Sequence, residues 1–252
     1  MRRMRVPVVM LMALLAAAPA LAIVHGKAVS QRLFQQRYPW AAIIENPVTG
    51  GVCAGALIAP RYVITAAHCT GPHKRVLLGH TERGRARAVE VEAAIRHPAY
   101  DPNTHQFDVG LFRLAEPQAI EPLPLISRGE YLLLVRPDAP AEILGWGQRP
   151  DSGPSMRLVR AAIHLHELAV RGTYLFYRDR GGPCGGDSGG PLLVEGLDGR
   201  PVLVGVASTT GGNLCSSGGG LAAYTNIAAV RRFIAETMAE DLSVPAGAGR
   251  GR

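Results

Sequence analysis

The chain has 252 residues, of which 47% are hydrophobic and 19% are charged. This length accommodates one large domain of the β class or two small ones, and the 30 glycines and 19 prolines favour many turns over long helices. The formal net charge of +7 comes without an arginine-rich stripe that carries interleaved aromatic residues, so we expect no nucleic-acid partner.

Residues 1–22 have the three parts of a secretory signal peptide. Three arginines form a positive start, residues 6–18 form an apolar stretch, and Ala20-Leu21-Ala22 is a small-x-small cleavage site. An uncleaved N-terminal anchor is the alternative, but the apolar stretch is short for a membrane span. Loss of three arginines lowers the net charge from +7 to +4. We therefore expect a secreted or periplasmic protein with no stable membrane insertion after cleavage.

From residue 23 onward, short apolar runs alternate with turn signals, which is typical of strands. A proline-rich connection near residues 115–125 divides these runs into two halves. The one predicted helix is the last element, residues 227–238, with Asn226 as its N-cap. We expect paired β-barrels or a sandwich over residues 23–238 and a disordered tail over residues 239–252. The predicted strands are residues 40–44, 53–58, 62–65, 76–78, 89–95, 107–114, 141–146, 158–165, 192–194 and 202–207.

Glycines surround one serine in the segment Gly185-Gly186-Asp187-Ser188-Gly189-Gly190-Pro191. Because glycine reaches positive φ without a Cβ clash, such a segment can turn sharply and aim both a serine hydroxyl and nearby N–H groups into a cleft. A plain glycine-rich surface loop is the alternative interpretation. The adjacent carboxylate and the partners described next favour Ser188 as a nucleophile.

Acyl transfer by serine requires a base that takes the hydroxyl proton and an acid that orients the base. His68 follows the apolar run 62–65 in a turn of small residues, beside Cys69. Asp108 lies within the apolar run 107–114, where an unpaired carboxylate would be costly, so we expect a histidine partner. The histidines that we expect to be surface or satisfied core residues are His73, His80, His105, His164 and His166.

The first residue after the predicted signal peptide is Ile23, which becomes a free N-terminus if cleavage follows Ala22. An ammonium group can enter an apolar core only if an anion lies beside it, and Asp187 is the candidate anion. A competing cleavage site after Ala20 would leave two residues ahead of Ile23.

The four cysteines, an even count in an exported chain, indicate disulfides, although sequence order does not choose among the three possible pairings. His164 and His166 have a spacing that could bind a metal, but no cysteine or carboxylate cluster completes such a site. The segment 79–97 lacks the spaced acidic ligands of a calcium site. We therefore expect neither a metal nor a cofactor.

Together these residues resemble the chymotrypsin-like serine proteases, which have the trypsin fold. The resemblance spans about residues 23–238, and its motifs follow the order His…Asp…Ser, which distinguishes it from unrelated serine hydrolases. The motifs are Ile23-Val24-His25-Gly26, Thr65-Ala66-Ala67-His68-Cys69, His97-Pro98 with Tyr100, Asp108-Val109-Gly110-Leu111, Gly145-Trp146-Gly147, Gly186-Asp187-Ser188-Gly189-Gly190-Pro191, Val204-Gly205-Val206-Ala207-Ser208 and Tyr224-Thr225-Asn226-Ile227.

The resemblance implies an all-β fold of two antiparallel six-stranded β-barrels, with the active site between them and a C-terminal α-helix. It implies Ser188 as nucleophile, His68 as general base and Asp108 as the acid that orients His68. We expect a monomer that acts on protein or peptide substrates. The resemblance further implies an oxyanion hole from the N–H groups of Gly186 and Ser188, a hydrogen bond from Ser208 to Asp108, and the disulfides Cys53–Cys69 and Cys184–Cys215.

The substrate pocket departs from the family pattern. Gly182 stands six residues before the serine, where an aspartate would select Lys or Arg, and Thr209 and Thr210 replace a Trp-Gly pair on the pocket wall. Ala222 lies near the glycine position of the opposite wall. A narrowed, uncharged pocket predicts a preference for small or medium apolar side chains before the cut.

The segment before Ile23 also departs from the family pattern. Ala22 of the predicted signal peptide directly precedes Ile23, where most relatives carry a propeptide. We hypothesise that signal peptidase itself releases the activating N-terminus. The main alternative function is a binding protein on an inactive protease scaffold, which the altered pocket wall would favour. An esterase of the α/β-hydrolase class would need a histidine after the serine, and none follows Ser188.

Overall fold

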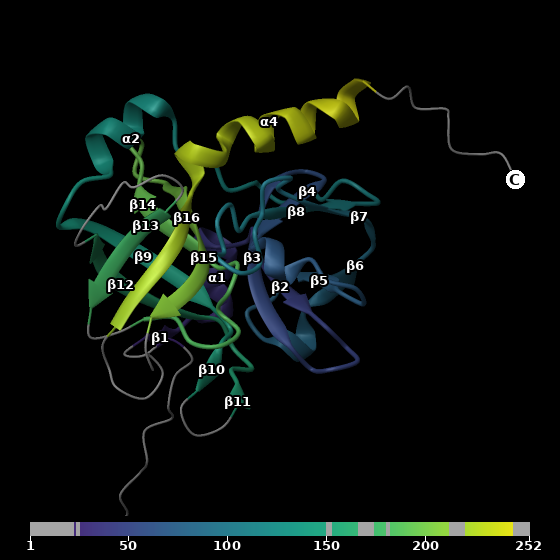
Figure 1. Cartoon of the computed structure of the whole chain (residues 1–252). Coiled ribbons are helices and arrows are strands. Elements are labelled where there is room, and N and C mark those ends of the chain that lie inside the picture. The colour runs from purple at the N-terminus through teal and green to yellow at the C-terminus, as the bar shows by residue number, and fades with distance from the viewer. Residues whose placement is uncertain are drawn as a thin grey trace, which may run out of the picture.

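The computed structural model describes residues 23, 26–149, 153–165, 174–179, 182–211 and 220–243. Within these ranges the chain forms two antiparallel sheets that lie next to each other, and a C-terminal helix runs along one end of both (Figure 1). The chain passes from the first sheet to the second between Leu114 and Ala139.

The first sheet has seven strands in the order β6-β5-β2-β3-β4-β8-β7. Its two outermost strands, β6 and β7, follow one another in the chain and are interrupted only at Glu90, so one nearly continuous segment closes the sheet on itself. The strands are β2 (Ala41–Glu45), β3 (Val52–Ala59), β4 (Tyr62–Thr65), β5 (Arg75–Leu78), β6 (Arg87–Val89), β7 (Val91–Arg96) and β8 (Gly110–Leu114).

The second sheet also has seven strands, in the order β1-β12-β9-β14-β15-β16-β13. The short strand β1 comes from the N-terminal segment and pairs with β12, and β12 also contacts β13 at the far edge of the sheet. The strands are β1 (Lys27–Ala28), β9 (Ala139–Gly145), β12 (Val159–Leu165), β13 (Tyr174–Asp179), β14 (Pro191–Glu195), β15 (Pro201–Gly211) and β16 (Gly220–Asn226), and a separate pair is formed by β10 (Gln148–Arg149) and β11 (Gly153–Pro154).

The predicted all-β class, with two antiparallel sheets and a C-terminal helix, is confirmed. Each sheet has seven strands, whereas the family resemblance implied six strands in each half. In the first sheet the predicted strand 89–95 is extended and broken at Glu90, and in the second sheet β1 is an additional strand at the edge. Asp108 lies just before β8 rather than inside a strand.

The terminal helix α4 (Ile227–Ser243) begins as predicted, because the side chain of Asn226 accepts a hydrogen bond from the amide of Ala228 at 2.9 Å. It continues past Met238 to Ser243, so the first residues of the segment predicted to be a disordered tail are helical. Residues 244–252 lie outside the described part of the chain.

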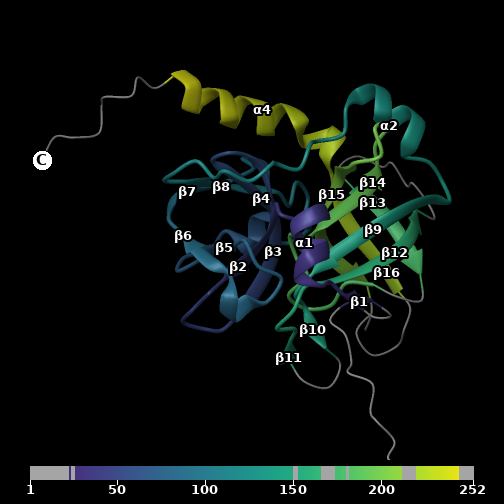
Figure 2. The ribbon, with the colours of Figure 1, turned by 180° about the vertical axis from the view of Figure 1, so that it is seen from behind.

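Within the described residues, two further α-helices were missed by the sequence analysis. In α1 (Gln31–Arg37) the Ser30 hydroxyl caps the first turn, and α2 (Arg128–Leu134) begins with a capping box between Ser127 and Glu130. Helix α1 lies where the two sheets meet, on the face seen in Figure 2. Its Gln31 accepts a hydrogen bond from the amide of Thr81 in the first half, and Tyr38 just after it donates to Glu142 of β9.

The buried apolar side chains form one cluster that spans both sheets. Its largest members include Trp146, Tyr224 and Phe112, and each fully buried aliphatic or Phe side chain contributes about 1.5–3 kcal/mol. The sheets touch where β3 meets β14 and where β4 meets β15. No helix in the described part of the chain is long and apolar enough to cross a membrane.

Candidate active site

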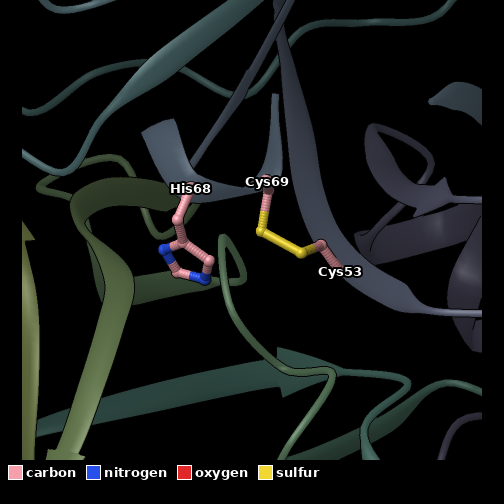
Figure 3. Close-up of side chains that lie close together, drawn as sticks. All are labelled: Cys53, His68 and Cys69. Atoms are coloured by element: carbon pink, nitrogen blue, oxygen red, sulfur yellow. A yellow bond between two sulfur atoms is a disulfide. The ribbon is translucent and has the colours of Figure 1, made fainter. Parts of the chain in front are cut away.

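His68 lies on the 3₁₀ helix η1 (Ala67–Cys69), directly after β4. The small residues Ala66 and Ala67 are fully buried, which lets the chain turn tightly against the sheet. Cys69 forms a disulfide with Cys53 of β3, with an S–S distance of 1.99 Å, and Figure 3 shows this bond beside the imidazole of His68. The disulfide implied by the resemblance is therefore present, and it joins the segment that carries His68 to the sheet.

The carboxylate of Asp108 accepts two hydrogen bonds from His68. The Nδ1 atom of His68 lies 2.7 Å from Oδ2 of Asp108, and the backbone N–H of His68 donates to Oδ1 at 3.0 Å. The hydroxyl of Ser208 donates to the same Oδ2 at 2.7 Å. Because an ionised carboxylate only accepts hydrogen bonds, Nδ1 of His68 must carry the proton, which leaves Nε2 free to act as a base.

The carboxylate of Asp108 stays charged although it has no exposed surface. Burial by itself raises the pKa of Asp108, but the hydrogen bonds from His68 and Ser208 outweigh it and hold the pKa below its ordinary value. The hydroxyl of Thr225 also donates to the Asp108 carbonyl oxygen, at 2.8 Å. The acid is thus fixed by both halves of the protein.

Ser188 lies in a tight loop between Cys184 and β14, where the two sheets meet. Its carbonyl oxygen accepts a hydrogen bond from the amide of Ala54 at 2.8 Å and lies 3.7 Å from the sulfur of Cys69. Gly189 adopts φ +79°, and a Cβ at this position would overlap Thr65 and the carbonyl of Ala54. Only glycine therefore allows this loop to approach the strands that lead to His68.

Gly186, two residues before the serine, also requires a glycine backbone, because its φ is +95°. The turn around it is closed by the amide of Asp187, which donates to the carbonyl of Cys184 at 3.0 Å. The residues predicted to supply the oxyanion hole, Gly186 and Ser188, therefore stand on the same turn.

Asp187 is buried, and its side chain points away from solvent into the second half. Oδ1 accepts from the amide of Gly147 at 2.7 Å and Oδ2 accepts from that of Cys184 at 2.9 Å. A Cβ at Gly145 or Gly147 would overlap this carboxylate, which explains the glycines on both sides of Trp146. With Ile23 still joined to residue 22, burial raises the pKa of Asp187 to about 6.

Ile23, the predicted partner of Asp187, has no exposed surface. Its carbonyl oxygen accepts a hydrogen bond from the amide of Gly26 at 2.8 Å. Residues 1–22 and 24–25 lie outside the described part of the chain, and so does the predicted signal peptide.

Three of the four predicted pocket residues, Thr209, Thr210 and Ala222, lie on β15 and β16. Thr210 on β15 is paired with Ala222 on β16, and Thr209 is paired with Ala223 after an irregularity that follows Ala207. Gly182 is buried just ahead of the serine loop. Cys184 is disulfide-bonded, and its expected partner Cys215 lies outside the described residues.

One histidine was misjudged from the sequence. His105 was expected to be a surface or satisfied core residue, yet its Nδ1 lies 3.6 Å from Oδ2 of Asp108 and is buried, with no hydrogen-bond partner among the described residues. No local pattern marks it, because its neighbours form an ordinary polar turn; only its position three residues before Asp108 could have drawn attention. His164 is exposed, as expected, and His166 lies outside the described residues.

Comparisons with known proteins identify the family. A family model described as Trypsin matches residues 23–234. Trypsin of Simulium vittatum is 35% identical over 182 residues, covering 62% of this chain and 69% of that protein. Kallikrein-14 of Homo sapiens is 31% identical, covering 79% of each chain. Trypsin-4 of Rattus norvegicus is 28% identical, covering 75% of this chain and 81% of its own. The chain therefore belongs to the trypsin family of serine proteases.

Proposed function

We propose that this protein is a serine endopeptidase that cuts peptide bonds through an acyl-enzyme intermediate. The observation that carries the proposal is the hydrogen-bonded chain from Ser208 to Asp108 to His68, next to a loop that holds Ser188 at the junction of the two sheets. Serine acyl transfer requires a nucleophile, a base and an acid that orients the base, and this arrangement supports those roles for Ser188, His68 and Asp108.

In the first half of the proposed reaction, Oγ of Ser188 attacks the scissile carbonyl carbon while Nε2 of His68 takes the hydroxyl proton. The N–H groups of Gly186 and Ser188 stabilise the oxyanion of the tetrahedral intermediate. His68 then gives its proton to the leaving amine, and the acyl-enzyme remains. Asp108 stays ionised throughout and stabilises the imidazolium.

In the second half, a water molecule takes the place of the amine. His68 removes a proton from the water as it attacks the ester carbonyl, and the same oxyanion contacts form again. Collapse of this intermediate returns the proton to Oγ of Ser188 and releases the carboxylic acid product. The cycle needs no metal or cofactor.

We propose that the enzyme prefers small or medium apolar side chains before the cut and does not select Lys or Arg. The absence of a carboxylate at Gly182 and the pairing of Thr210 with Ala222 across β15 and β16 support this specificity. One methylene changes discrimination by about 1–3 kcal/mol in an apolar pocket, so a threonine where relatives carry glycine is a sizeable obstruction.

We further propose that export and activation are one step. Signal peptidase would cut after Ala22 and free the ammonium of Ile23, which would pair with the carboxylate of Asp187. The burial of both residues supports this proposal, since a buried carboxylate without a cation is unfavourable. The product would be a monomer, either secreted or retained in a periplasm. N-terminal sequencing of active exported protein tests the step, because a start at Leu21 would contradict it.

The experiment that tests the function is digestion of a mixed peptide library by the mature protein and by the variant Ser188→Ala. We expect cuts that disappear in the variant, and the residue before each cut reports the pocket. A mature protein with a confirmed Ile23 terminus that makes no cuts would contradict the proposal and favour a binding protein on a protease scaffold.

A further inference from the structure

The ring of His97 lies against two aromatic side chains that come from different parts of the chain. It stacks on Phe107, with the ring planes 8° apart and the centroids 4.7 Å apart. The ring of Phe233 on α4 lies at the same centroid distance from His97 and is tilted by 60°. Both separations are typical of favourable contacts between aromatic rings. His97 therefore joins the terminal helix to the residue directly before Asp108.

His97 also holds the chain on both sides of Asp108. Its ring contacts Phe107, the residue before the carboxylate. Its backbone N–H donates to the carbonyl oxygen of Val109, the residue after the carboxylate, at 3.0 Å. The amide of Val109 in turn donates to the carbonyl oxygen of Phe107 at 2.7 Å. Asp108 is thus the middle residue of a short turn, and both ends of this turn are attached to His97.

The backbone of Phe107 requires such an attachment. Its φ is +53°, in the left-handed region, which is a strained conformation for a bulky side chain. A strained backbone persists only where the surrounding contacts fix it. The stacking on His97 is such a contact. Without it the turn can relax toward negative φ, and the carboxylate of Asp108 then moves with respect to His68.

The imidazole of His97 takes part in this contact as a neutral aromatic ring. Burial lowers the pKa of His97 below its ordinary value. Its Nδ1 accepts a hydrogen bond from the amide of Ala99 at 3.2 Å, and only an unprotonated nitrogen can accept. The contact with Phe107 therefore depends on the ring and not on a charge, so a phenylalanine in place of His97 would preserve it.

Helix α4 brings Phe233 from the second half of the protein to the first half. It follows β16 of the second sheet and runs over one end of the first sheet (Figure 1). One turn beyond Phe233, the carbonyl oxygen of Thr237 accepts a buried hydrogen bond from the hydroxyl of Tyr62 at 3.3 Å. Tyr62 begins β4, the strand that leads to His68. The helix therefore contacts the segments that carry both the acid and the base.

The geometry points to an aromatic stack, formed by His97, Phe107 and Phe233, that positions the carboxylate of the proposed triad. The three residues act through Asp108 and not on the substrate. Their effect on the rate rests on the proposed protease function, whereas their effect on the hydrogen bond between Asp108 and His68 does not. The carboxylate keeps its other hydrogen bonds when the stack is lost. Loss of the stack therefore lowers the rate less than loss of the carboxylate itself.

The position of the carboxylate is tested by proton NMR on the mature Ser188→Ala protein, which requires no cleavage. The proton between Nδ1 of His68 and Asp108 gives a signal far downfield of the amides, because this hydrogen bond is short and charge-assisted. Asp108→Asn identifies the signal by its loss. We expect His97→Phe, which keeps the ring, to retain the signal. We expect His97→Leu, which keeps only apolar bulk, to lose it through exchange with solvent. An unchanged signal in His97→Leu would overturn the proposal.

The two substitutions of His97 form a matched pair. Both remove the nitrogen that accepts from Ala99, so the loss of that hydrogen bond does not explain a difference between them. Phe233→Tyr and Phe233→Leu form a second pair of the same kind, for which we expect the same difference. The control for general loosening of α4 is Met238→Ala, because Met238 packs on the core from the same helix and has no ring.

The effect on catalysis is tested by cleavage kinetics of these variants in the mature protein with Ser188 intact. We expect kcat to fall by about 10- to 100-fold in His97→Leu with little change in KM, since a misplacement of about 1 Å has effects of this size. His97→Phe should keep the parent kcat, and Met238→Ala should lower the melting temperature alone. Equal kcat in the two His97 variants, or an equal loss in Met238→Ala, would contradict the proposal. A parent that cuts nothing would instead refute the protease function and leave the NMR result to decide.

Discussion

The backbone amide of Ala54 donates to the carbonyl oxygen of Ser188 across 2.8 Å, so the candidate nucleophile is attached through its own backbone to the opposite sheet. Ala54 lies on β3 next to Cys53, whose disulfide reaches the residue after His68. Strand β3 therefore positions both the serine loop and the segment that carries His68. Strands of both halves hold the candidate site, which is the preorganisation that the proposed acyl transfer requires.

We predict that Asp108→Asn abolishes most of the activity while the protein stays folded. The asparagine amide would donate to Nδ1 of His68, which would place the proton on Nε2 and remove the base. The expected loss in kcat is about 10⁴-fold. Cleavage kinetics measure it, with thermal unfolding as the test of folding. The matched control is Asp198→Asn, an exposed carboxylate that pairs with Arg200 in the turn between β14 and β15, and full loss of activity there would contradict the explanation.

Asp187 predicts a pH dependence of stability in any chain whose Ile23 is not a free N-terminus. Burial raises the pKa of Asp187 from 3.8 to about 6, so the folded state holds a proton that the unfolded state releases between these values. The protonated carboxyl group of Asp187 contributes its full stabilisation of the folded state below pH 3.8, and this contribution is lost as the pH rises through 6. The free energy of unfolding falls by about 3 kcal/mol in total over this range.

The measurement is the urea midpoint from pH 4 to pH 7 for a Ser188→Ala chain that carries extra residues before Ile23. Asp187→Asn should flatten this dependence, because the titrating group is gone. In a chain that begins at Ile23, the same substitution should destabilise the protein at neutral pH, since the ammonium loses its anion. If the urea midpoint changes equally with pH in the extended chain with Asp187 and in the extended Asp187→Asn chain, Asp187 does not titrate in this range.

Specificity should respond to Thr210. The variant Thr210→Gly removes the side chain paired opposite Ala222, so the pocket should widen and accept larger apolar residues. We expect the ratio of kcat/KM for Phe over Ala before the cut to rise by at least about tenfold. Val202→Ala is the control, because it loosens the opposite end of β15, where that strand pairs with β14. An equal rise in both variants would indicate general loosening of β15.

The disulfide between Cys53 and Cys69 should contribute strongly to stability. The cysteines are 16 residues apart, and closing a loop of this size contributes about 3 kcal/mol in the chain-entropy model. The double variant Cys53→Ala, Cys69→Ala should lower the free energy of unfolding by this amount and also reduce kcat, because η1 carries His68. A loss of stability with unchanged kcat would show that the strand alone positions the base.

The helices show which elements can be predicted from local sequence signals. The start of α4 was predictable, because Asn226 and the apolar spacing after it act within one turn. Helices α1 and α2 have equally local signals in Ser30 and in the Ser127–Glu130 box, but each spans only seven residues and carries no clear apolar period. Strand β13 and the edge strand β1 were also missed, since their pairing partners are distant in the chain.

The sequence by itself determined the chemistry of the candidate site. Glycines that permit positive φ around Ser188, a histidine after a run of small residues and a carboxylate in an apolar setting are local features, and their order along the chain completed the family resemblance. Tertiary structure alone decided what lies beside these groups. The hydrogen bond from Ser208 to Asp108 could be anticipated only through the resemblance, and the approach of His105 was not anticipated at all. A side chain in a polar turn acquires its neighbours from the backbone path of the loop and from contacts across the two sheets, and no local pattern encodes these.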